Sequence, residues 1–112
     1  MNNELNFMEL YDLVDYYFKD KGRIISVLTD EQEINCILYD SFIFKCGIEE
    51  PRNNFKGAIM INNKYAQITF FGESISLNNT REDIIKNFEL VDKYCQLRLP
   101  DKYLEAFFKN KN

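Results

Sequence analysis

The sequence predicts a single α+β domain, residues 1–112, with a five-stranded antiparallel sheet over residues 23–71. One helix precedes the sheet and two follow it, in the order α-β-β-β-β-β-α-α. Apolar residues recur at helical spacing near both ends of the chain, while short runs rich in β-branched residues alternate with polar turns between them. Because the strands are consecutive in the chain, we expect antiparallel pairing and helices gathered on one face of the sheet.

The first helix is expected over residues 3–19, where apolar side chains form a stripe about 120° wide. The stripe contains Phe7, Leu10, Tyr11, Val14, Tyr17 and Phe18. Cations at Lys19 and Lys21, followed by Gly22, are typical of a helix end.

The strands are expected at 23–28, 33–39, 42–48, 57–61 and 65–71, and residues 75–77 leave room for a short sixth. Asp40-Ser41 and Asn62-Asn63-Lys64 are the expected hairpin turns, since asparagine tolerates the positive φ that such turns require.

Two helices are expected after the sheet. Thr80 is a good N-cap for the first, and its core stripe consists of Ile84, Ile85, Phe88, Val91 and Cys95. Pro100 can start the second, over residues 100–109, which we expect to pack against Leu90 and Leu97. Its expected buried residues are Tyr103, Leu104, Phe107 and Phe108.

Charge is divided unevenly along the chain. Residues 1–50 carry eleven carboxylates and four basic side chains, a net charge of −7, whereas the remaining residues carry +3 and the whole chain −4. A surface of one sign steers and selects molecules of the opposite sign. The sequence therefore favours a basic partner and disfavours direct nucleic-acid binding, for which a basic surface is typical.

Histidine is absent from the chain, which removes the commonest general base, the commonest metal ligand and every Ser-His or Cys-His pair. The three cysteines lack metal-site spacing, and no glycine-rich phosphate loop is present. We expect no enzymatic activity, no catalytic or metal-binding residues and no cofactor, although an enzyme built from carboxylates alone stays open. If residues 40–42 form a three-residue turn, Cys36 and Cys46 lie opposite each other, and packing is favoured over a redox role.

The chain begins with Met-Asn-Asn-Glu, whereas the start of a secretory signal is basic, and no apolar run approaches the roughly 20 residues of a membrane span. Reduced, packed thiols fit the cytosol. We therefore expect a cytoplasmic protein without membrane contacts.

The first helix also carries apolar residues opposite its core stripe. Leu5, Met8, Leu13 and Tyr16 alternate there with Glu9, Asp12 and Asp20. Two interpretations remain open: a binding surface of aromatic and acidic residues, or a secondary core covered by another element. The residues expected to bind a partner are Glu9, Asp12, Asp15, Tyr16, Asp30, Glu31, Glu33, Glu49 and Glu50.

In overall character the chain resembles the small acidic immunity proteins of bacterial contact-dependent growth inhibition and related polymorphic-toxin systems. The shared features are a short chain rich in Asn, Lys and Ile, abundant Tyr and Phe, a carboxylate-dense region and no catalytic constellation. The resemblance implies a non-catalytic inhibitor that binds a cognate toxin domain, often a basic nuclease, and masks its active site or nucleic-acid groove. It rests on no motif, so no functional residue is carried over from those families.

Two alternatives share this character. Class I type III secretion chaperones are also small acidic α+β proteins, but they have a helix between the third and fourth strands where this sequence predicts none. They dimerise, whereas a monomer is favoured here. A phage-encoded inhibitor of a nucleic-acid-binding enzyme would use the same acidic surface as an immunity protein.

Overall fold

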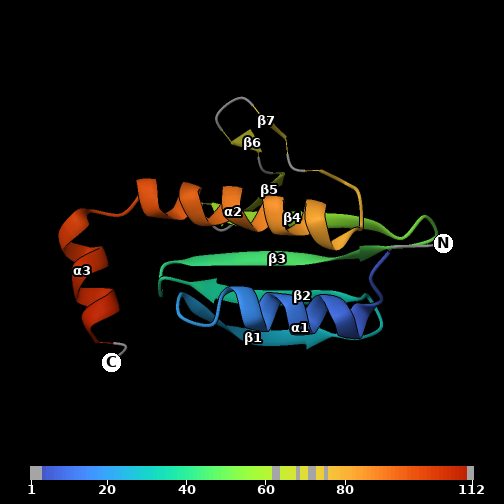
Figure 1. The fold of residues 1–112 in the computed structure, drawn as a ribbon, viewed down its shortest axis with the longest axis horizontal. Helices are drawn as coiled ribbons and strands as arrows, with labels where there is room; N and C mark the ends of the chain where they lie inside the picture. The colour runs from blue at the N-terminus through green and yellow to red at the C-terminus, as the bar shows by residue number, and fades with distance from the viewer. Residues whose placement is uncertain (1–3, 62–63, 68, 71–72, 75, 111–112) are drawn as a thin grey trace.

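A computed structural model describes residues 4–61, 64–67, 69–70, 73–74 and 76–110. The elements in chain order are α1 (Phe7–Tyr17), β1 (Gly22–Leu28), β2 (Glu33–Leu38), β3 (Phe42–Glu49), β4 (Asn54–Ile61), β5 (Lys64–Gln67), β6 (Thr69–Phe70), β7 (Glu73–Ser74), α2 (Arg81–Leu97) and α3 (Asp101–Lys109). The main sheet has the order β1-β2-β3-β4-β5, and all neighbouring strands are antiparallel. Both α1 and α2 cover the same face of this sheet (Figure 1).

The α+β class fits, but the predicted five-stranded sheet over residues 23–71 is wrong, because the sheet has a four-stranded body and its short edge strand β5 ends at Gln67. Four strands of six to eight residues, β1–β4, form the body of the sheet, and β5 adds only four residues at its edge. The chain then leaves the sheet, and β6 and β7 pair with each other in a separate two-stranded sheet. The cause lies at the start of β4, where the Phe55 amide donates to the Leu77 carbonyl at 2.9 Å. The segment before α2 thus occupies the position beside β4 that a longer β5 would need.

Two predictions, one of a turn and one of a strand, include residues that the structure does not describe. The expected turn at Asn62-Asn63-Lys64 includes Asn62 and Asn63, and the expected sixth strand includes Ile75, all of which lie outside the described residues. Ser76 and Leu77 are described and form no strand.

The α1 helix is shorter than the predicted span of 3–19. It begins after Asn6, whose side chain accepts a hydrogen bond from the Glu9 amide at 2.8 Å, while the Glu9 carboxylate accepts one from the Asn6 amide at 3.0 Å. This capping box satisfies free amides of the first turn. At the other end, the amides of Lys21 and Gly22 donate to the Phe18 carbonyl and lead the chain into β1.

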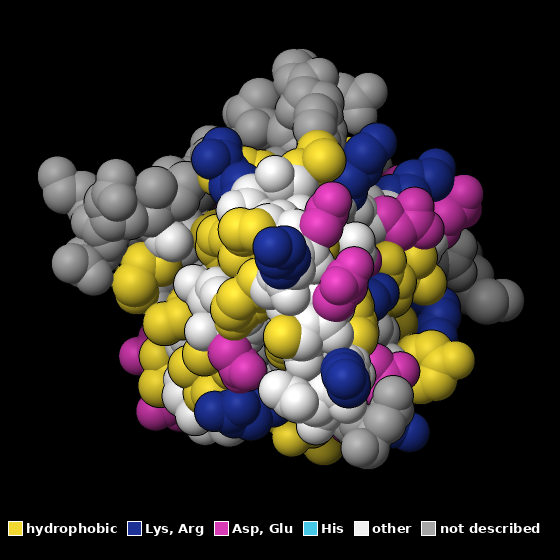
Figure 2. Space-filling view, turned by 90° about the vertical axis from the view of Figure 1, so that its left-hand side faces the viewer, with side chains coloured by type: hydrophobic (Ala, Val, Ile, Leu, Met, Phe, Trp, Pro, Cys, Tyr) yellow, Lys and Arg dark blue, Asp and Glu magenta, His cyan; other side chains and the backbone are white. Residues whose placement is uncertain are grey.

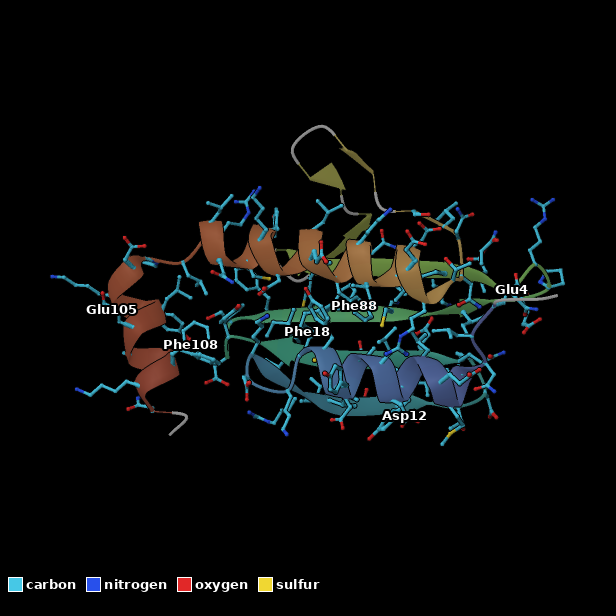
Figure 3. All side chains as sticks on the ribbon, in the orientation of Figure 1. Glu4, Asp12, Phe18, Phe88, Glu105 and Phe108 are labelled. Carbon is cyan, nitrogen blue, oxygen red and sulfur yellow. The ribbon has the colours of Figure 1, made fainter. Side chains whose placement is uncertain are left out.

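The core lies between the two long helices and the sheet. Phe88 of α2 packs against Phe18, Phe44 and Phe55, with ring centroids 5.0 to 6.2 Å apart, and Figure 3 shows Phe18 and Phe88 meeting over the sheet. Four of the five residues predicted for the α2 stripe are buried: Ile84, Phe88, Val91 and Cys95. The fifth, Ile85, is partly buried.

The position of α3 differs from the prediction. It lies across one end of the molecule, beyond the C-terminal end of α2 (Figure 1), and leaves Leu97 65% exposed. Of its four residues predicted to be buried, only Phe107 is, with Leu104 partly so, because α3 contacts the β2–β3 turn rather than the side of α2. There the Phe107 ring packs on Tyr39 at 5.2 Å.

Candidate functional site: an acidic end and a hollow beside α1

The antiparallel order of the strands brings separate acidic segments of the sequence to one end of the molecule. The β1–β2 turn carries Asp30 and Glu31, and the β3–β4 turn begins after Glu49 with Glu50. Both turns must lie at the same end of the sheet, since β1 and β3 run in the same direction. The start of α1 is at this end too. Figure 3 shows Glu4 there and Glu105 of α3 at the other end of the molecule. We call this surface the acidic end and define it by Glu9, Asp30, Glu31, Glu49 and Glu50.

A hollow of about 240 Å³ joins the start of α1 to these turns. Its lining residues are Glu4, Leu5, Asn6, Phe7, Gln32, Ile48, Glu50 and Asn53. The Gln32 side-chain amide donates to the Glu50 carboxylate at 3.1 Å and so connects the two turns. This contact fixes Glu50, whereas Asp30, Glu31 and Glu49 are exposed and form no ion pair within the described part of the chain.

Glu33 does not contribute a free charge to the acidic end. Its carboxylate lies 2.9 Å from the Lys56 ammonium and 3.8 Å from that of Lys45, and its side chain is largely buried. The hydrogen bond from Lys56 holds the pKa of Glu33 below its usual value. The two lysines already neutralise Glu33, so it is a weaker partner contact than the sequence indicated.

A second hollow, of about 270 Å³, lies between α1 and the first residue of α2. It is lined by Leu5, Glu9, Asp12, Leu13, Tyr16 and Arg81. Three of the predicted partner-binding residues, Glu9, Asp12 and Tyr16, therefore come together, and we call this feature the α1 hollow. Sequence reasoning missed Arg81, which has no ion pair among the described residues.

On the outer face of α1, each of the two interpretations left open by the sequence applies to some of the residues. Leu13 is only 2% exposed and Leu5 packs against the core, so these two are secondary core. Met8 and Tyr16 are 67% and 75% exposed. Large exposed side chains of these types, set among carboxylates, are typical of interfaces.

Asp15 lies on the other flank of α1. It is exposed, and its charge helps to raise the pKa of the Cys36 thiol in β2 to about 12, although burial is the larger cause. Asp15 is thus separated from the α1 hollow and is close to β2 instead.

The opposite end of the molecule holds a buried polar network that the sequence analysis did not find. The Tyr39 hydroxyl donates to the Asp92 carboxylate, and the Gln96 amide donates to both, at 3.1 and 3.2 Å. The Lys21 ammonium lies 3.1 Å from the same carboxylate. Burial and the carboxylate of Asp92 raise the pKa of Tyr39, and burial followed by Asp92 raises the pKa of Tyr17 to about 12.

This network connects structural elements to one another and has a structural role. Tyr39 is fully buried in a left-handed conformation, with φ of 54°, which costs about 1–2 kcal/mol in a non-glycine residue. The Tyr103 hydroxyl of α3 donates to the Tyr39 carbonyl at 2.6 Å and helps to hold it. One feature of the sequence could have indicated this network. Asp92 lies on the core stripe of α2, one turn from Phe88 and from Cys95.

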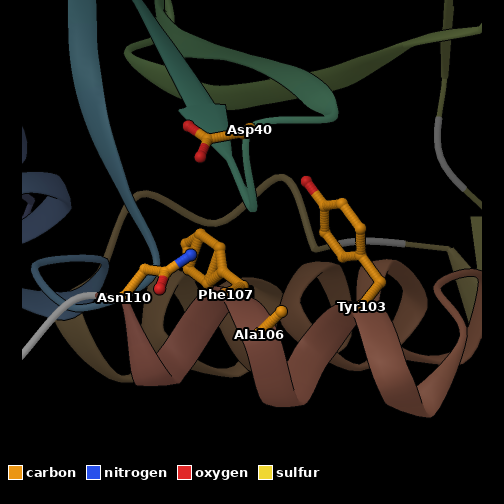
Figure 4. A pocket seen from close by; sticks show the side chains of 5 residues that line it. All are labelled: Asp40, Tyr103, Ala106, Phe107 and Asn110. Carbon is orange, nitrogen blue, oxygen red and sulfur yellow. The ribbon is translucent and has the colours of Figure 1, made fainter.

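A cavity of about 290 Å³ lies between α3 and the β2–β3 turn, lined by Asp40, Tyr103, Ala106, Phe107 and Asn110 (Figure 4). Its one carboxylate, Asp40, is 3.5 Å from the Arg23 guanidinium. Around this end the exposed charges of α3 alternate in sign, and Figure 2 shows acidic and basic side chains mixed with hydrophobic ones. The α3 end therefore contrasts with the acidic end.

The cysteines do not face each other as the sequence suggested. Cys36 pairs with Phe44, and Cys46 pairs with Ile34, because the β2–β3 connection is Tyr39-Asp40-Ser41. All three cysteines are free and buried, and burial raises the pKa of Cys36 and Cys95 to about 12 and that of Cys46 further. The thiols are therefore protonated at neutral pH.

Comparisons with known proteins add no relative. The chain matches no protein-family model, no curated protein and no solved structure. Within its described residues, no cluster of three or more Cys, Asp or Glu side chains could hold a metal ion. No described helix is long and apolar enough to cross a membrane.

Proposed function

We propose that the protein is a non-catalytic inhibitor of the immunity-protein kind, which binds a basic protein partner, a nuclease toxin domain, through the acidic end and the α1 hollow. Bound there, it masks the toxin's active site or nucleic-acid groove. The observation that carries this proposal is the convergence of carboxylates from three distant segments on one end of the molecule. The proposal places the protein in the cytoplasm, where a nuclease toxin acts.

Charge supports the choice of partner. Asp30, Glu31 and Glu49 are exposed and unpaired among the described residues, and Arg52 is the single basic side chain of the β3–β4 turn. A nuclease groove displays Lys and Arg because it binds phosphates. Carboxylates on an inhibitor can occupy such a groove and accelerate the encounter.

The α1 hollow provides an aromatic anchor for the partner, which exposed charge alone does not provide. Exposed carboxylates act mainly on the association rate, whereas buried aromatic anchors slow dissociation. Tyr16 is the exposed aromatic residue that borders the hollow, and Glu9 and Asp12 beside it can accept hydrogen bonds from a partner's Lys or Arg. Truncating Tyr16 to Ala should therefore speed dissociation and cost about 2 kcal/mol or more of binding energy if it is a central anchor.

The residue types support binding rather than catalysis. The chain lacks histidine, and its thiols are buried with raised pKa values. The exposed carboxylates of the acidic end lie on turns and a helix surface, with no activated nucleophile beside them among the described residues.

A growth-rescue assay tests the proposal. The toxin C-terminal domain that the proposal expects to be encoded beside the gene of this protein is expressed in cells with and without the full chain, and growth and nucleic-acid degradation are measured. We expect the wild-type chain and the Glu105→Lys variant to restore growth. The triple variant Asp30→Lys/Glu31→Lys/Glu49→Lys should restore it poorly while remaining folded.

The Glu105→Lys variant is a suitable control because Glu105 is exposed at the α3 end, far from the proposed interface. Failure of the wild-type chain both to bind the toxin domain and to restore growth would contradict the proposed function.

A further inference from the structure

The outer edge of β1 is a free strand edge. β1 is the terminal strand of the sheet, and residues 23–28 form no backbone–backbone hydrogen bond in the described structure besides the β1–β2 ladder. Ile25, Val27 and Leu28 on this strand are 47%, 36% and 43% exposed. Unpaired backbone groups and exposed apolar side chains on one edge form a template for another strand.

The usual protection of such an edge is weak here. Natural edge strands are often blocked by lysine, proline or a covering helix. The sequence of β1, Gly-Arg-Ile-Ile-Ser-Val-Leu, contains neither lysine nor proline, and α1 lies over the face of the sheet rather than beside its edge (Figure 1). Two protective features are present, the exposed charge of Arg23 and a bulge at Ile25, and the bulge leaves residues 22–24 and 26–28 regularly paired with β2.

The charge beyond the C-terminal end of this edge is acidic, whereas the exposed Lys19 and Asp20 before its start offset each other. The cations Lys21 and Arg23 are already paired, with Asp92 at 3.1 Å and Asp40 at 3.5 Å. Asp30 and Glu31 follow the strand, exposed and without an ion pair among the described residues.

We propose that β1 accepts an extended basic segment of a partner polypeptide as an added strand at the edge of the sheet. Main-chain hydrogen bonds to β1 would supply affinity, Ile25 and Val27 would contact apolar residues of the segment, and the carboxylates would select its Lys or Arg residues. The inference rests on the proposed function in that it takes the partner to be basic. A second copy of the chain fits less well, because a two-fold pairing of β1 strands centred on the bulge would set the two bulges against each other.

The test uses the full chain and a blocked peptide of about eight residues that alternates valine and lysine, a length chosen to exceed an average strand. Amide hydrogen exchange of β1 is measured with and without this peptide. One control peptide replaces lysine by glutamate, and another carries methyl groups on its central backbone amides. The lysine peptide should slow exchange at β1 about tenfold or more, and neither control should do so.

Variants of the chain give an independent readout. Ile25→Lys should weaken peptide binding about tenfold or more, since lysine on an edge strand opposes pairing. Leu97→Lys is the matched control, because it adds the same charge at an exposed apolar residue of α2 and should change nothing. Exchange of the β3 amides shows that each variant remains folded.

Unchanged exchange at β1 would overturn the proposal, and so would self-association of the chain through this edge. Equal binding of the methylated peptide would also overturn it, by showing attraction through charge alone, and would leave the proposed function intact. Conversely, a failed growth rescue with a positive peptide result would reject the proposed inhibitor while the edge acceptor stands.

Discussion

Phe88 is the residue on which the core depends most, because rings from α1, β3 and β4 meet on it. Tyr17 and Phe18 approach it at 5.4 and 5.0 Å, and Phe44 and Phe55 at 6.0 and 6.2 Å. Aromatic pairs at such distances add to the stabilisation that burial supplies.

Truncation of Phe88 to Ala should therefore lower the free energy of unfolding by about 3–5 kcal/mol, since a buried ring is removed and a cavity is left. Chemical denaturation measures this loss. Tyr16→Ala is the control and should stay within about ±0.5 kcal/mol of wild type, because Tyr16 is exposed. A loss below about 1 kcal/mol for Phe88→Ala would contradict the described core.

Stability should decline at alkaline pH. Tyr17, Cys36 and Cys95 have pKa values near 12 in the folded chain, above the ordinary values of 10 for tyrosine and 9 for cysteine. The folded state keeps these protons where the unfolded state loses them, so unfolding becomes easier as pH rises from about 9 to 12. Denaturation midpoints across this range measure the effect, and Tyr17→Phe should flatten it above pH 10. A midpoint that is constant up to pH 12 would be inconsistent with these buried groups.

Residue burial was predictable where it depends on one element and not where it depends on two. Val14, Phe88 and Val91 were identified from helical spacing alone. The burial of Leu13 was left open and that of Asp92 was missed, because what these residues contact is set by neighbouring elements rather than by their own helices. Tyr39 gave no local signal, since its burial depends on α3 closing over the β2–β3 turn.

At the scale of elements, the local sequence determined which segments form helices. Contacts with distant segments determined where several of the elements begin or end. The Asn6–Glu9 capping box explains why α1 begins at Phe7. The end of β5 could not be inferred, because it depends on the hydrogen bond by which the Phe55 amide of β4 holds Leu77 beside that strand.

Removing the α1 cap gives a test at this scale. Asn6→Ala should cost about 1 kcal/mol, because it leaves the Glu9 amide without its side-chain acceptor. Met8→Ala on the same helix is exposed and should be nearly neutral. Thermal unfolding measured by circular dichroism compares the two variants. Equal effects would show that the cap does not stabilise α1.

At the scale of the whole molecule, the acidic end follows from topology. Hairpins that follow one another place alternate turns at the same end of a sheet, so the acidic turns after β1 and β3 had to meet. The charge asymmetry was visible in the sequence, and its concentration on one end required the strand order. The ion pairs of Glu33 with Lys45 and Lys56 could not be foreseen, because they join residues from three strands.

The most direct test of the central claim is the association rate with the toxin domain at two ionic strengths. The acidic end should make wild-type association fast and strongly slowed by salt. The triple variant Asp30→Lys/Glu31→Lys/Glu49→Lys should associate more slowly with a flatter salt dependence and a nearly unchanged dissociation rate, whereas Glu105→Lys should behave as wild type. Association that is indifferent to salt and to these three carboxylates would contradict the claim that the acidic end binds a basic partner.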